Sequence, residues 1–290
     1  MPERPFYIVD VFAERRYAGN QLAVVTRAEG LSSDEMQSIA REFNFAETTF
    51  LTGEAPRDGG YDVRIFTPRF EVPFAGHPTL GTAWVVREAL AAERGSRVVL
   101  NTRAGQIPVT FDEDVLWMRQ NTPLFGATTD AATMSAVLGV EPGDVDAAFP
   151  IQEVSTGLPA WIVPLLSIDA VRRARLDVGR YESLIESSEA KNILLFSRET
   201  EAPENQLHVR MFAHHFGVPE DPATGSANGC LAGWLVEHRY LGDGSVAARV
   251  EQGYEMGRPS LLRLKARRRE DGIGVDVGGR VVPVARGEWL

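Results

Sequence analysis

Two segments of the chain lack charged residues, and each has the pattern of a helix that is buried on every side. Residues 78–86 (PTLGTAWVV) and 225–236 (GSANGCLAGWLV) contain no Asp, Glu, Lys or Arg. A helix at a protein surface needs a polar face toward water, so a helix without one is surrounded by other residues. We therefore predict one central helix in each half of the chain.

Runs of β-branched and aromatic residues predict strands around the first central helix. Such residues fit the pleated, half-buried surface of a sheet, and the runs cover residues 6–12, 22–25, 47–51 and 61–66. Before the third run, Ser32 and Ser33 followed by Asp34 and Glu35 predict the start of a surface helix that ends near Phe43. The first third of the chain is thus expected to mix strands with a helix.

The order of these elements recurs in the second half of the chain. Residues 61–73 (YDVRIFTPRFEVP) align without a gap with residues 207–219 (LHVRMFAHHFGVP), and six of the thirteen pairs are identical. After a three-residue insertion, Gly76 pairs with Gly225 and His77 with Ser226. Weaker similarity relates residues 46–54 to residues 191–199, and residues 17–25 to residues 155–163.

A repeat of about half the chain predicts two homologous lobes, because a solenoid would repeat every 20 to 50 residues. We expect an α/β (α+β) fold in which each lobe is a curved, mostly antiparallel sheet wrapped around its central helix. Pro123, Gly126 and neighbouring threonines indicate a boundary between the lobes. The expected lobes are residues 1–125 and 126–279, with residues 280–290 packing back onto the first lobe and the active site between the two.

Both central helices begin at a glycine-centred turn, FAGHPT at residues 74–79 and DPATGSA at residues 221–227. The first backbone N–H groups of a helix lack partners within the helix and carry a partial positive charge. Two such helix starts facing each other across a cleft would bind a small carboxylate. The alternative is that both are ordinary capped helix starts.

Three side chains near these turns are candidates for acid/base chemistry. His77 lies at the first helix start, although a single histidine often has only a structural role. Asp221 precedes a proline and could equally be a turn residue. Glu47 stands in an apolar strand, so it is either on the solvent face or desolvated as a proton-transferring carboxylate requires.

Five motifs in this order resemble the PhzF-type, phenazine-biosynthesis-like isomerases. They are VDVFAERRYAGNQLAVV at residues 9–25, NFAETTF at 44–50, FTPRFEVPFAGHPTLGTA at 66–83, EDPATGSANG at 220–229 and QGYEMGRPS at 252–260. The resemblance implies a diaminopimelate-epimerase-like fold and a homodimeric enzyme without a cofactor. In the biosynthetic member of that family, the reaction is the isomerisation of trans-2,3-dihydro-3-hydroxyanthranilate by a proton shift.

The resemblance also assigns roles to residues. It implies that Glu47 transfers the proton and that His77 and Asp221 assist or position the substrate. The implied contacts to the substrate and its carboxylate come from Asn20, Gly76, Thr224, Gly225 and Ser226. This chain departs from the family pattern at Ala46, where many relatives carry Ser, and at Gln21, where Pro is common. These departures leave the substrate open.

Composition limits the remaining possibilities. A formal net charge of −10 and a pI of about 5.1 disfavour nucleic acid and anionic membranes as partners. The single cysteine, Cys230, excludes a mechanism that needs two thiols, and its apolar surroundings predict a core position. The absence of a signal-peptide pattern favours the cytoplasm. The five histidines show no metal-binding spacing, and His214 and His215 are expected on opposite faces of a strand, so no metal is expected.

We therefore expect a cofactor-independent isomerase that moves a proton on a small carboxylate by general acid/base catalysis. A lyase or dehydratase that uses the same proton abstraction is the alternative enzyme, and a non-catalytic carboxylate-binding protein is the alternative outside catalysis. Arg64 and Arg210, which are equivalent in the repeat, could instead bind the substrate carboxylate. The physiological substrate and its stereochemistry do not follow from the sequence.

Overall fold

The computed structural model describes residues 4–91, 93–242 and 244–289, which divide into two compact units. Unit 1 spans the described residues up to Met118 and those from Gly278 onward, whereas unit 2 is Arg119–Val277. The first boundary lies before the expected one at residue 125, because the backbone N–H of Gln120 already donates to Val275 within unit 2. The chain passes into unit 2 at the end of β8 and returns through β16.

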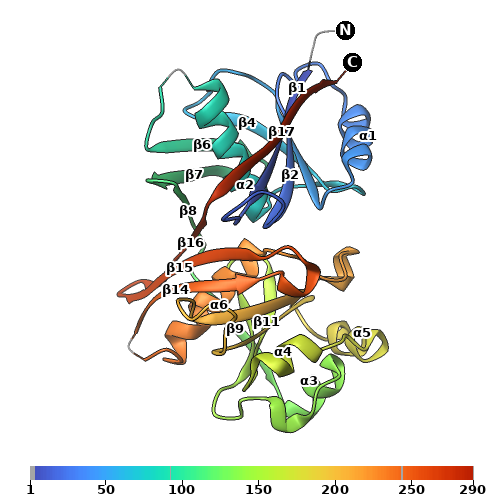
Figure 1. The fold of residues 1–290 in the computed structure, drawn as a ribbon, viewed down its shortest axis with the longest axis vertical. Coiled ribbons are helices and arrows are strands. Elements are labelled where there is room, and N and C mark those ends of the chain that lie inside the picture. The colour runs from blue at the N-terminus through green and yellow to red at the C-terminus, as the bar shows by residue number, and fades with distance from the viewer. Residues whose placement is uncertain (1–3, 92, 243, 290) are drawn as a thin grey trace. The chain divides into compact units, whose positions relative to one another are not determined.

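Unit 1 contains a mostly antiparallel sheet, the buried helix α2 and the surface helix α1 (Figure 1). Its elements are β1 (Arg4–Val11), β2 (Asn20–Val25), α1 (Ser33–Phe43), β3 (Glu47–Leu51), β4 (Tyr61–Phe66), β5 (Glu71–Val72), α2 (Gly76–Val85), the π-helical turn η1 (Val86–Leu90), β6 (Arg97–Thr102), β7 (Gly105–Asp112), β8 (Val115–Arg119) and β17 (Val281–Trp289). β17 pairs antiparallel with β1 along its length, from Arg4 opposite Trp289 to Val11 opposite Val281. The C-terminal residues thus complete the sheet of unit 1.

Unit 2 contains a second sheet around helix α6, with three short helices outside it (Figure 1). Its elements are β9 (Leu124–Thr129), α3 (Ala131–Leu138), η2 (Pro142–Asp144), β10 (Ile151–Ser155), β11 (Pro159–Pro164), α4 (Ile168–Arg173), α5 (Val178–Glu186), β12 (Asn192–Ser197), β13 (Leu207–Phe212), η3 (His214–Phe216), α6 (Gly225–Glu237), β14 (Ser245–Gln252), η4 (Tyr254–Met256), β15 (Ser260–Arg269) and β16 (Gly272–Gly279). The observed fold is a mixed α/β protein, as expected.

The two units share one order of strand pairing. In unit 1 the pairs β1–β2, β2–β3, β3–β4, β4–β6 and β6–β7 alternate between antiparallel and parallel, beginning with antiparallel. In unit 2 the pairs β10–β11, β11–β12, β12–β13, β13–β14 and β14–β15 alternate in the same way. The register agrees as well, since Phe50 lies opposite Arg64 and Leu195 lies opposite Arg210. The alignments of residues 46–54 and 61–73 with the second half are therefore confirmed at the level of strand register.

The predicted central helices are confirmed as buried. Helix α2 packs against β1, β2, β3, β6 and β7, and helix α6 packs against β10, β11, β12, β14 and β15. Small residues allow this close approach, because a Cβ added at Gly81 would lie 2.5 Å from the side chain of Leu22. Cys230 lies in α6 with no exposed surface, so its predicted core position is also confirmed. Burial raises the pKa of its thiol to about 11.

Arg64 and Arg210 have equivalent structural roles, which explains why the repeat retains both. The Nε and Nη2 groups of Arg64 donate to the two carboxylate oxygens of Glu71 at 2.8 and 2.6 Å. Those of Arg210 donate to Glu220 in the same way, at 2.9 and 2.8 Å. Each guanidinium also lies 5.0 Å from a phenylalanine ring, that of Phe66 or Phe212. Both arginines are thus occupied by internal carboxylates.

The expectation for His214 and His215 was wrong, because they lie in the 3₁₀ turn η3 and not in a strand. The chain turns there through Gly217, which has a φ of +79° that favours glycine. The expected helix after Ser32 is confirmed, and Ser32 forms a reciprocal capping box with Glu35 at the start of α1.

We expect Arg210→Met to destabilise the protein more than Arg64→Met. Beyond Glu220, Arg210 donates to the carbonyls of Val171, Arg172 and Ala174 at the end of α4, so its loss should cost about 3–5 kcal/mol. Arg64 is more exposed and should cost about 1–2 kcal/mol. Urea unfolding followed by tryptophan fluorescence measures both values.

Arg27→Met is the control, since the Arg27–Glu54 pair is about half exposed and should contribute under about 1 kcal/mol. Equal losses for the Arg64 and Arg210 variants would show that the contacts to α4 do not stabilise the fold.

Candidate active site

The central helices differ from the surface helices in how they begin. Helices α1, α3, α4 and α5 each have a side-chain cap, supplied by Ser32, Asp130, Ser167 and Asp177. Helices α2 and α6 have none, since neither Ala75 nor Thr224 caps its helix through its side chain. The N-cap residues of both central helices therefore do not provide the side-chain cap that the surface helices have.

Glu47 and His77 lie together in unit 1. The Nε2 atom of His77 is 3.5 Å from a carboxylate oxygen of Glu47. Glu47 is the first residue of β3, and His77 is the second residue of α2. His77 is buried, and the side chain of Glu47 retains 19% of its exposure. Glu47 is therefore mostly desolvated but still accessible, which suits a group that exchanges a proton with a ligand.

The imidazole of His77 is neutral over the whole physiological range. Burial lowers the pKa of His77 to about 3, against the opposing effect of a hydrogen bond with the backbone of Gln21. Gln21 follows the turn at Gly19, where a φ of +65° and a Cβ only 2.3 Å from the carbonyl oxygen of Val11 require glycine. The turn places Asn20, which is buried, at the start of β2. The sequence AGNQ thus sets the backbone that holds His77.

In unit 2, Asp221 and Thr224 form the turn before α6. The hydroxyl of Thr224 donates to Oδ2 of Asp221, and the backbone N–H of Asp221 donates to Met211 at 3.0 Å. Gly225 and Ser226 are the first two residues of α6, and Ser226 is partly exposed. The candidates thus form two groups, with Asn20, Glu47, Gly76 and His77 in unit 1 and Asp221, Thr224, Gly225 and Ser226 in unit 2.

The repeat does not duplicate the acid/base pair. The register that places Leu22 opposite Glu47 in unit 1 places Ala160 opposite Asn192 in unit 2, so Asn192 is the counterpart of Glu47. Ser226 is the counterpart of His77 in the sequence alignment. Neither Asn192 nor Ser226 titrates near neutral pH, so acid/base chemistry at these positions is confined to unit 1.

A buried charged cluster beside β14 is absent from the residues that the sequence predicts for the site. The ring nitrogens of His208 lie 3.0 Å from Glu251 and 2.9 Å from Glu255. Burial alone would lower the pKa of His208, but these two hydrogen bonds outweigh it and raise the pKa to about 9. Glu251 also accepts from the backbone N–H groups of residues 201 and 202. The only signal in the sequence was the motif at residues 252–260, which contains Glu255 and follows Glu251.

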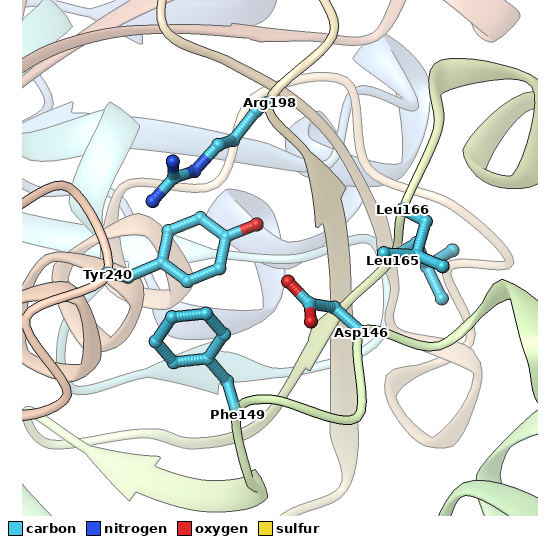
Figure 2. Close-up of a pocket in the computed structure, with 6 residues that line it drawn as sticks. All are labelled: Asp146, Phe149, Leu165, Leu166, Arg198 and Tyr240. Carbon is cyan, nitrogen blue, oxygen red and sulfur yellow. The ribbon is translucent and has the colours of Figure 1, made fainter.

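Two cavities in the described part of the chain lie away from the candidate residues. One cavity of about 290 Å³ in unit 2 is shown in Figure 2, where Arg198 stacks on Tyr240 and Asp146 faces the tyrosine hydroxyl. A cavity of about 490 Å³ in unit 1 is lined by residues such as Tyr61 and Arg97. Within residues 4–91, 93–242 and 244–289, no group of three or more His, Cys, Asp or Glu is arranged to hold a metal ion. Over the same ranges, none of the helices has the length and apolarity to span a bilayer.

The class of the protein follows from comparison with known families. The chain belongs to the PhzC-PhzF family of phenazine biosynthesis-like proteins, whose model matches residues 9–287, and it is an isomerase of that family. It is 36% identical over 290 residues to the trans-2,3-dihydro-3-hydroxyanthranilate isomerase of Pseudomonas fluorescens, covering 97% of this chain and 98% of that protein.

Solved structures agree with this class. The crystal structure of a PhzF-family phenazine biosynthesis protein from Bacillus anthracis superimposes with a TM-score of 0.90 at 27% identity, covering all of both chains. A hydroxyproline epimerase from Agrobacterium vitis shares the fold with a TM-score of 0.63 at 10% identity, covering 100% of this chain and 91% of the epimerase. The expected relation to the epimerase and racemase fold is therefore confirmed in its coarse form.

The two buried histidines should give opposite pH dependence of stability. The pKa of His77 is depressed in the folded state, so unfolding takes up a proton and stability falls as the pH drops from about 6.5 toward 3. The pKa of His208 is raised, so its contribution is complete below about pH 6.5 and is lost as the pH rises through about 9. That contribution is about 3 kcal/mol at most.

Urea midpoints measured between pH 4 and pH 9.5 test this expectation for the wild type, His77→Gln and His208→Gln. The difference between the wild type and His77→Gln should change on the acid side, and the difference for His208→Gln on the alkaline side. A constant difference for both variants across the range would contradict the assigned protonation states.

Proposed function

We propose that the chain is a cofactor-independent isomerase that moves a proton between two carbon atoms of a small carboxylate, with Glu47 as the proton-transferring residue. The observation that carries the proposal is the pair formed by Glu47 and the neutral, buried imidazole of His77, 3.5 Å apart at the uncapped start of α2. Proton transfer at carbon requires a base that is partly desolvated and within reach of the substrate. Glu47 is partly desolvated, and the exposed 19% of its side chain supports access to a ligand.

The proposed reaction conserves all atoms of the substrate. Glu47 takes a proton from an acidic C–H bond, and the electron pair of that bond shifts along an adjacent double bond. The protonated Glu47 then delivers the proton to the carbon at the far end, where a new C–H bond forms. His77 stays neutral and therefore adds no positive charge beside Glu47. A positive charge there would favour the ionised carboxylate and so oppose the step in which Glu47 takes up the proton.

The substrate carboxylate is proposed to bind at uncapped helix N-termini. The first N–H groups of α2 at Gly76 and of α6 at Gly225 and Ser226 carry partial positive charge. Thr224 and Asp221 would orient the substrate at α6, and Asn20 would do so beside His77.

The name of the Pseudomonas fluorescens relative supplies the first compound to test, trans-2,3-dihydro-3-hydroxyanthranilate. The alternatives make different products. A lyase or dehydratase would use the same proton abstraction but release a fragment or water, whereas a non-catalytic binding protein would leave the ligand unchanged.

We expect Glu47→Gln to lower turnover of trans-2,3-dihydro-3-hydroxyanthranilate by about 10²–10⁴-fold while the protein still binds its ligand, since the amide keeps the shape but cannot accept the proton. NMR of the wild-type reaction in D₂O should show a product isomeric with the substrate, with deuterium at the newly protonated carbon to the extent that the protonated Glu47 exchanges with solvent before it delivers its proton. Glu54→Gln is the control, because Glu54 lies in an exposed pair with Arg27. Full turnover by Glu47→Gln would remove Glu47 from the mechanism.

A thermal-shift titration with anthranilate tests the carboxylate site. At a hundredfold excess over its Kd, a ligand of the folded state stabilises it by about 2.7 kcal/mol, so the wild type should melt several degrees higher. Asp221→Ala should lose most of this shift. Asp177→Ala, which removes the cap of α5, should melt lower without ligand but keep the same shift. Equal shifts for the wild type and Asp221→Ala would contradict the role of Asp221.

A further inference from the structure

Gln252 is a fully buried polar residue at the point where β14 ends in unit 2. It opens the motif QGYEMGRPS, and its backbone lies opposite Val209 of β13 and Ser260 of β15. A glutamine in such a place loses its hydration and must be satisfied by the protein. The partners of its side chain therefore indicate why a polar residue is present.

The side chain of Gln252 forms four hydrogen bonds. All four are to the loop before α6 or to the first turn of α6, the segment that contains the unit 2 candidates. Its Oε1 atom accepts from the backbone N–H of Thr224 at 3.2 Å and from Nδ2 of Asn228 at 2.8 Å. Its Nε2 group donates to the carbonyl of Asp221 at 2.7 Å and to the hydroxyl of Thr224 at 3.1 Å. Each atom of the amide thus has two partners of the correct kind, which fixes its orientation.

These bonds determine the direction of the next hydrogen bond. The hydroxyl of Thr224 has a single hydrogen, and its oxygen already accepts from Gln252. Its hydrogen is therefore directed to the carboxylate of Asp221, the partner that the geometry provides. In this way Gln252 sets both the backbone of the turn and the orientation of the group that contacts Asp221.

The neighbours of Gln252 tighten the same turn. Gly253 has a φ of +77°, and a Cβ there would lie 2.6 Å from the carbonyl oxygen of Pro222. Only glycine permits this approach of the chain after β14 to the turn before α6. Asn228, which binds Gln252, also donates to the carbonyl of Thr224 at 3.0 Å. The turn is thus held from β14 and from α6.

We propose that Gln252 is a positioning residue, which holds Asp221 and the N-terminus of α6 in the geometry that binds the substrate carboxylate. The inference rests on the proposed function, because it acts through Asp221, Thr224, Gly225 and Ser226. Gln252 is expected to affect substrate binding and not the proton transfer, because the pair Glu47–His77 belongs to unit 1. When a group that positions the substrate is displaced by about 1 Å, the efficiency of the reaction can fall by up to about a hundredfold.

The first experiment measures the hold on the turn without any ligand. In Gln252→Met, which keeps the length of the side chain, the N–H of Thr224 loses its acceptor, and we expect its hydrogen exchange, followed by NMR, to become at least about tenfold faster. Gln152→Met is the control, because Gln152 in β10 bonds to Gly126 and His238. Unchanged exchange at Thr224 in Gln252→Met would overturn the inference.

The second experiment separates positioning from general destabilisation. With trans-2,3-dihydro-3-hydroxyanthranilate as substrate, Gln252→Met should raise KM about tenfold or more and change kcat by less than about threefold. Loss of folded enzyme alone would lower the apparent kcat and leave KM unchanged, and that result would overturn the inference. Gln152→Met should keep the KM of the wild type.

Gln252→Glu distinguishes the two effects of the amide. The substituted carboxylate can still accept from Thr224 and Asn228, but it cannot donate to Asp221 or to the hydroxyl of Thr224. We expect exchange at Thr224 to stay slow while KM rises, because that hydroxyl can turn toward the new carboxylate and away from Asp221. A wild-type KM in this variant would overturn the orienting role.

The proposed function fails separately from this inference. If the wild type neither converts trans-2,3-dihydro-3-hydroxyanthranilate nor is stabilised by anthranilate, the proposed function is overturned for this substrate class. Hydrogen exchange at Thr224 in Gln252→Met is then the only test of the inference. Faster exchange supports the conclusion that Gln252 stabilises the turn before α6, whereas unchanged exchange overturns it.

Discussion

The fold of each unit depends on burying one central helix on all sides. The first N–H groups of that helix have no side-chain cap. The helix must be apolar on all faces because a curved sheet surrounds it, and helices α2 and α6 meet this condition. Its N-terminus nevertheless presents backbone N–H groups, which need partners from water, protein or ligand. The surface helices satisfy theirs with Ser or Asp caps. The central helices have no such caps, and this difference is the link between the fold and the proposed carboxylate site.

The repeat supplies this architecture twice but the titratable chemistry only once. Glu47 and His77 of unit 1 correspond to Asn192 and Ser226 of unit 2. Unit 2 instead gains Asp221 within the three-residue insertion before α6. The bidentate pairs of Arg64 with Glu71 and of Arg210 with Glu220 remain in both, and each joins an interior strand to the segment before a central helix. Structural residues thus persist in both copies, while the candidate catalytic residues differ.

The two buried histidines show how different surroundings shift the pKa of the same side chain in opposite directions. His77 is buried and has a backbone partner at Gln21, so burial dominates and the imidazole stays neutral. His208 has two carboxylates on its two ring nitrogens, so hydrogen bonding dominates and it stays charged. A neutral imidazole beside Glu47 suits proton exchange, whereas a charged one between Glu251 and Glu255 holds strands and turn together next to Gln252.

The sequence by itself determined the central helices and the repeat, because these depend on local pattern, and its short motifs supplied the candidates for the site. Charge-free segments predict burial, and the alignment of residues 61–73 with 207–219 holds in the strand register. Only the tertiary structure decided the partners of long polar side chains. Gln252 and Asp221, or His208 and Glu251, are distant in sequence, and strand pairing and the turn before α6 bring them together. Hydrogen bonds between such residues depend on three-dimensional geometry that no local pattern encodes.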